Sequence, residues 1–180
     1  MTMTADTSIN HVERADFLQT LQGHRQFLRY TVQGLSDEQA RQRTTASQLT
    51  LGGLLKHVTR TESAWADFIA GGAAAMVHES EGWTPEAAAE RWASNFEMQP
   101  GETLAGLLAA YDEVARRTDE MVTTLPDLDA SHALPEAPWF PPGAHWSARR
   151  VLLHVVAETS QHAGHADIIR ESLDGQKTMG

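Results

Sequence analysis

The chain has 180 residues, a length typical of one domain, and its 41% hydrophobic and 21% charged residues are ordinary for a globular protein. It contains no cysteine, which excludes disulfides and a cysteine nucleophile and leaves imidazole and carboxylate groups as the metal ligands. The net charge of −10 disfavours nucleic acid and anionic membranes as partners. No signal peptide and no run of about 18 apolar residues is present, so we predict one cytoplasmic domain over residues 1–180, with 1–10 flexible.

The first part of the chain predicts two long amphipathic helices with a short helix between them. Apolar residues recur at helical spacing from about Val12 to Leu35, and the segment from Ser36 to Gln39 matches a capping box. A second long helix is predicted from Thr50 to the pair Gly71-Gly72. Near its start, Gly52-Gly53 lowers helix propensity, and we expect this pair to permit a close backbone approach.

The next region predicts a mixed connection followed by a third long helix. Within residues 73–101, Thr84-Pro85 is typical of a helix start, and we predict a short helix to about Trp92. The third long helix is predicted from about Glu102 to Leu125.

The last part predicts a long loop and a fourth long helix. Residues 126–146 are rich in proline and aromatic residues, and we expect an ordered loop across one end of the molecule. Ser147 is the expected N-cap of a helix to about Leu173, with Gly175 after its end. We find no β-alternation of useful length. Four long helices with long connections predict an all-α four-helix bundle.

Nine histidines is a high count, and several of them gather on the last helix. His154, Glu158, His162 and His165 fall at roughly 0°, 40°, 80° and 20° around the helix axis, so all four share one face. Apolar residues share this face, so it is expected to point inward, where buried imidazoles and carboxylates need partners.

A metal ion would satisfy several of these groups together. Glu158 and His162 lie one turn apart, which suits two ligands of one ion. An open mononuclear site needs a third protein ligand, and His57, which lies among apolar residues of the second long helix, is the best candidate. A hydrogen-bonded core pair and a solvated helix face are the alternatives at this point.

Two segments carry a resemblance to a known family. The stretch from Thr50 through His57-Val-Thr-Arg-Thr-Glu62 resembles the second helix of DinB-like proteins, and His162-Ala-Gly-His-Ala-Asp-Ile-Ile-Arg-Glu171 resembles their last helix. The resemblance implies a four-helix bundle and a metal site at His57, Glu158 and His162. Many members have histidine where this chain has Glu158. The His/Glu/His form resembles the branch of mycothiol-dependent maleylpyruvate isomerases and thiol S-transferases, whose site holds zinc.

The same resemblance implies a metal-dependent thiol S-transferase or isomerase. Its co-substrate is a low-molecular-weight thiol such as mycothiol or bacillithiol, and its other substrate is a small electrophile. Zinc is the expected metal, with nickel as the second choice. Two alternatives stay open: a metal-assisted hydrolase at the same site, and a non-enzymatic, stress-related metal-binding module whose site is closed by His154 or His165. Members of the family often pair, so a homodimer is expected.

Other residues are candidates for supporting roles. We predict that His165, His154 and Asp167 orient the metal ligands, the alternatives being packing and a surface ion pair of Asp167 with Arg170. Arg149 and Arg150 could bind an anionic substrate, the alternative being a solvated helix face. We predict Arg149 as the substrate-binding residue. The aromatic residues of the irregular regions are candidates for the pocket lining: Trp139, Phe140, Trp146 and Trp83.

Overall fold

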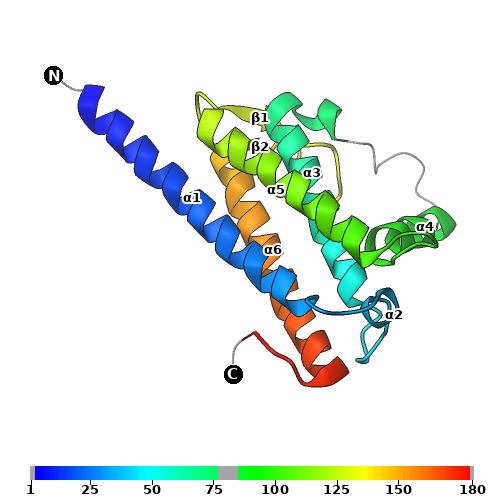
Figure 1. Cartoon of the computed structure of the whole chain (residues 1–180). Coiled ribbons are helices and arrows are strands. Elements are labelled where there is room, and N and C mark those ends of the chain that lie inside the picture. Colours follow the sequence, from blue (N-terminus) through cyan, green and yellow to red (C-terminus); the bar gives the residue numbers. More distant parts are fainter. Residues whose placement is uncertain (1–2, 77–84, 179–180) are drawn as a thin grey trace.

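The computed structural model describes residues 3–76 and 85–178, and it shows an all-α bundle with one small sheet (Figure 1). This confirms the predicted fold class. The long helices of the described chain are α1 (Met3–Thr31), α3 (Leu51–Gly71), α5 (Leu104–Thr124) and α6 (Ala148–Asp174). The shorter elements are α2 (Asp37–Ala40), the 3-10 helix η1 (Ala73–Ala75), α4 (Pro85–Phe96), β1 (Ser131–Ala133) and β2 (His145–Ser147).

The four long helices pack around a common core. Helix α6 packs against α1 and α3, and α5 packs against α3 and α1. Helices α1 and α6 run in one direction, and α3 and α5 run in the opposite direction (Figure 1). Helices α3 and α6, which carry the predicted metal ligands, are therefore antiparallel neighbours. None of the described helices has the length and apolarity that a bilayer span requires.

Side-chain caps start the long helices where the sequence predicts them. Ser147 accepts a hydrogen bond from the backbone N–H of Arg150, and Thr50 accepts one from that of Gly53. The predicted capping box of α2 is present. Thr103 caps α5, so this helix begins slightly later than predicted. Gly175 follows α6 with φ 81°, a left-handed conformation that glycine adopts without steric cost.

Some predicted boundaries and one predicted absence were wrong. Helix α1 begins well before Val12, and α4 extends past Trp92 to Phe96. The chain also contains β-structure, because β1 and β2 pair antiparallel with His132 opposite Trp146. Strands of three residues are too short to show alternation in the sequence. Thr84 and Trp83 lie outside the described residues.

The core consists of two apolar clusters separated by a buried ion pair. One cluster surrounds the start of α3 and the end of α6, and the other surrounds the end of α3 and the start of α6. Between them, Arg25 of α1 pairs with Glu62 of α3, and Arg25 also contacts Asp119 of α5 at 2.7 Å. This polar layer links three of the four long helices.

The Gly52-Gly53 pair allows α4 to approach α3 closely, as predicted. A Cβ atom placed on Gly53 would lie 1.7 Å from the carbonyl oxygen of Phe96, and one on Gly52 would lie 2.1 Å from Sδ of Met98. Only glycine leaves room for this contact. The end of α4 is thereby held one helical turn from His57.

Candidate metal centre

The three predicted metal ligands converge between α3 and α6. His57 projects from α3, and Glu158 and His162 project from successive turns of α6. One possible ligand atom from each lies within 4.8 Å of the other two. All three side chains are partly buried. Among the described residues, these three form the one group of histidine and carboxylate side chains that is close enough together to hold a single ion.

The distances between the donors suit a metal ion. Nε2 of His162 lies 3.5 Å from Oε2 of Glu158, and the rings of His57 and His162 lie edge to face with centroids 4.8 Å apart. Two ligands bound at about 2.1 Å to a tetrahedral ion are about 3.4 Å apart. Two imidazoles and one carboxylate are also a donor set that zinc and nickel accept. The residues therefore fit a divalent metal with a coordination position left open.

The protonation states favour metal binding as well. The pKa of His57 is lowered to about 4, mainly by burial and also by the nearby His162 and Arg60, while Glu158 acts in the opposite direction. His57 is thus neutral at pH 7, with a lone pair available to a metal. The pKa of Glu158 is also lowered, chiefly by its hydrogen bond with His162, so Glu158 is a carboxylate at neutral pH.

An aromatic stack holds the His57 ring in place. Phe96 lies against it with ring centroids 4.1 Å apart and an interplanar angle of 21°, and Trp92 stacks on Phe96 at 5.2 Å. Thr61, one turn further along α3, places its hydroxyl 3.5 Å from Nε2 of His57. Sequence reasoning missed Phe96 and Trp92 as site residues. Their i, i+4 spacing on a short helix was the available signal.

His165 and His154 flank the three ligands along α6. Nδ1 of His165 lies 3.4 Å from Nδ1 of His162, and Nε2 of His154 lies 3.8 Å from Oε1 of Glu158. Each histidine therefore touches one member of the cluster. Neither belongs to the group of three whose ligand atoms converge.

Next to His154 lies an aromatic wall formed by Trp65, Trp146 and Phe140. Trp146 stacks on Trp65 of α3 at 4.8 Å, and the ring of His154 stands edge-on to both tryptophans at 5.1 and 5.0 Å. Phe140 packs beside Trp146, whereas Trp139 is 67% exposed and reaches the wall only through Phe140. Trp65 was not among the residues predicted for the site, although it lies two turns from His57 on a similar face of the helix.

Two predicted site residues point elsewhere. Oδ1 of Asp167 accepts a hydrogen bond of 2.6 Å from the backbone N–H of Thr178. Its suggested partner Arg170 pairs with Asp174 instead. Arg149 forms ion pairs with Glu13 of α1 and Asp129 of the loop before β1. The structure therefore does not bring Asp167 or Arg149 to the ligand cluster.

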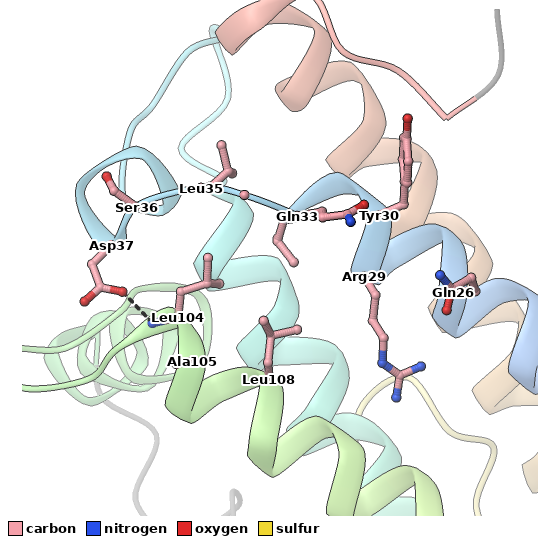
Figure 2. A pocket seen from close by; sticks show the side chains of 12 residues that line it. Gln26, Arg29, Tyr30, Gln33, Leu35, Ser36, Asp37, Leu104, Ala105 and Leu108 are labelled. Carbon is pink, nitrogen blue, oxygen red and sulfur yellow. Dashed lines mark hydrogen bonds between the residues drawn. The ribbon is translucent and has the colours of Figure 1, made fainter.

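A separate hollow of about 470 Å³ lies between the end of α1 and the start of α5 (Figure 2). Its two charged residues are paired within the chain: Asp37 accepts a hydrogen bond of 2.7 Å from the N–H of Leu104, and Arg29 pairs with Asp112. No residue of the His/Glu cluster lines it. We therefore assign this hollow no role in the chemistry of the cluster.

The fold and the cluster define a helical bundle with a candidate three-ligand metal centre between two antiparallel helices. Comparison with known families confirms the predicted resemblance. The chain belongs to the mycothiol S-transferase family, because the family profile described as Mycothiol-S-transferase matches residues 16–175.

Comparison with solved structures supports the same fold. A crystal structure described as the conserved protein of locus from Enterococcus faecalis matches with a TM-score of 0.64 and 14% identity, over 89% of this chain and 96% of that chain. At this identity the match shows the fold alone. A search of curated proteins gave no match.

Proposed function

We propose that this chain joins the sulfur of a low-molecular-weight thiol to a carbon of a small electrophile, at the site formed by His57, Glu158 and His162. Membership of the mycothiol S-transferase family supports the reaction class, and mycothiol is the thiol we propose. The observation that carries the proposal is the convergence of His57 with the Glu158/His162 pair. A divalent metal bound there, zinc or else nickel, would supply the positive charge that lowers the pKa of a thiol and favours the thiolate at neutral pH.

The thiol must come from outside the chain, since the sequence contains no cysteine. In the transfer, the thiol loses its proton to solvent and the sulfur lone pair forms a bond to the electrophilic carbon. The leaving group then departs with the electrons of the broken bond. This balance requires no oxidant or reductant.

The residues of the site have distinct parts in this proposal. His57 presents a neutral imidazole because burial disfavours its protonation. Phe96 fixes the orientation of that ring by stacking. His165 orients His162 through the nitrogen on the opposite side of its ring from Glu158, and His154 plays the corresponding part for Glu158.

The aromatic wall provides the place for the electrophile. Trp65 and Trp146 lie edge-on to His154, and Phe140 packs against Trp146. Their rings offer an apolar surface that excludes water from a bound electrophile. Trp139, at the outer edge, contributes less in this proposal because most of its surface faces solvent.

Metal content and thiol transfer should be measured together on purified protein and its variants. We expect His57→Ala, Glu158→Gln and His162→Ala each to lose most of the bound metal, measured by elemental analysis, and to lose transfer of mycothiol to a chlorinated electrophile. His11→Ala, at an exposed position on α1, is the matched histidine control. Full metal occupancy in both His57→Ala and His162→Ala would overturn the ligand assignment. Ester hydrolysis without thiol would instead identify a hydrolase.

The oligomeric state and the cellular location remain predictions. We propose a homodimer in the cytoplasm, and sedimentation velocity on the purified chain tests the first part. A single species with the mass of one 19.8 kDa chain at all concentrations would contradict it.

A further inference from the structure

Arg150 differs from its neighbour Arg149 in what its guanidinium contacts. Arg149 is paired with two carboxylates, those of Glu13 and Asp129. The guanidinium carbon of Arg150 lies over the ring of Trp146, 4.3 Å from its centroid. Within residues 3–76 and 85–178, no carboxylate is found paired with Arg150. Its positive charge is therefore available to a ligand.

The platform beneath Arg150 is held on several sides. Trp146 belongs to β2, where it pairs with His132 of β1, and its ring stacks on Trp65 of α3. A guanidinium placed over an aromatic face keeps its N–H donors directed outward from its edge, where a carboxylate can accept two of them. Because the tryptophan restrains the long arginine side chain, less conformational entropy is lost when the ligand binds.

Arg150 also lies on the side of α6 that leads to the metal centre. Arg150, His154 and Glu158 occupy positions i, i+4 and i+8, so they follow one another along one side of the helix. The ring of His154 lies edge-on to that of Trp146 with centroids 5.1 Å apart, and the guanidinium of Arg150 lies over the same Trp146 ring. The guanidinium is thus near His154, on the side of the helix that carries the proposed metal ligands.

We propose that Arg150, supported by Trp146, binds a carboxylate of the electrophile and so selects aromatic carboxylates as substrates. This inference rests on the proposed thiol transfer. Arg150 and Glu158 are two turns apart, about 12 Å along the helix axis. A planar ring with the carboxylate at one end and the reacting carbon at the other would reach across much of that separation. The substrate class is an electrophile whose carboxylate and reacting carbon lie on opposite sides of a planar ring.

Binding can be tested without any thiol. Benzoate and benzamide have nearly the same shape but differ in charge, and quenching of tryptophan fluorescence reports their binding beside Trp65 and Trp146. We expect Arg150→Gln to weaken benzoate binding about tenfold and to leave benzamide binding unchanged. Arg116→Gln, which removes the same charge from an exposed position on α5, should bind both ligands like the unaltered protein. Equal benzoate affinity in Arg150→Gln and the unaltered protein would overturn the inference.

A kinetic test separates two possible sources of the carboxylate, the electrophile and the thiol. The electrophiles are 4-(chloromethyl)benzoate and 4-(chloromethyl)benzamide, and the thiols are N-acetylcysteine and its uncharged analogue N-acetylcysteamine. We expect Arg150→Gln to raise the KM of the charged electrophile about tenfold with either thiol, while kcat stays the same. Arg150→Lys should bring this KM part of the way back to that of the unaltered protein. A loss that follows the charge of the thiol instead would overturn the assignment to the electrophile. Absence of transfer from mycothiol as well as from these two thiols would count against the proposed function and leave the binding result standing.

Discussion

His57 and Phe96 lie face to face, with ring centroids 4.1 Å apart and planes inclined by 21°. Phe96 is the last residue of α4, in the connection between α3 and α5, and not part of a long helix of the bundle. The orientation of a proposed metal ligand on α3 therefore depends on the packing of a short neighbouring helix.

Replacing Phe96 should loosen the His57 ring and weaken metal binding. Aromatic pairs contribute about 0.5–1.5 kcal/mol beyond area burial, so we expect Phe96→Leu to raise the dissociation constant for zinc about threefold to tenfold, measured by competition with a chelating dye. Phe27→Leu, at a 44% exposed position on α1, is the control. Equal zinc affinity in the two variants would show that stacking does not position His57.

The glycine contact between α3 and α4 gives a second test of the same arrangement. Gly53→Ala would place a methyl group 1.7 Å from the backbone oxygen of Phe96, so α4 has to move. We expect a loss of about 1–3 kcal/mol in the free energy of unfolding, measured in urea, together with weaker zinc binding. Gly23→Ala on α1 has no neighbouring atom within 4 Å and should instead stabilise the fold slightly. A neutral Gly53→Ala would rule out the close approach.

Removing one partner of the buried ion pair between Arg25 and Glu62 should strongly destabilise the fold. Both side chains are almost fully buried, so Glu62→Ala leaves a charged guanidinium whose remaining carboxylate partner, among the residues described, is Asp119. We expect this variant to lose about 3–5 kcal/mol in urea unfolding. Replacing both partners, as in Arg25→Met with Glu62→Leu, should recover most of the loss.

Glu113→Gln is the control for this pair, because its ion pair with Arg116 is exposed. It should leave the free energy of unfolding almost unchanged. A Glu62→Ala variant as stable as this control would show that the polar layer contributes little to the fold.

The metal-free protein should lose stability as the pH falls below neutrality. His57 has a pKa of about 4 in the folded chain, lowered mainly by burial, against 6.5 when exposed. Between these values the unfolded chain binds a proton that the folded chain does not, so the free energy of unfolding falls as pH drops from about 6.5 towards 4. At pH 5 the resulting loss in the free energy of unfolding is about 1–2 kcal/mol, allowing for the partial exposure of the ring.

This dependence is measured by urea unfolding in the presence of a chelator. His57→Gln should be less sensitive to pH between 5 and 7 than the unaltered chain. A weaker dependence of the free energy of unfolding on pH should remain in His57→Gln, because burial also lowers the pKa of His154. Identical slopes for the two proteins would mean that His57 is not protected from protonation by the fold.

Much of the helical framework could be predicted because its signals are local. The caps at Ser147 and Thr50 lie within three residues of the groups that they bind. The shared face of His154, Glu158, His162 and His165 follows from helical periodicity alone. The short β1–β2 pair was missed because three residues per strand carry no periodic signal, and the start of α1 was missed because residues 3–11 contain few apolar residues at helical spacing.

The sequence by itself determined the helices, the donor types available to a metal and the pairing of Glu158 with His162 on one helix. Only the tertiary structure decided what surrounds them: Phe96 against His57, Trp65 against Trp146, Arg149 turned to Glu13 and Arg150 placed over Trp146. The physical reason is the separation along the chain of the residues that interact. Hydrogen bonds within a helix join residues a turn apart, whereas these contacts join segments brought together only when the apolar faces of the helices pack against one another.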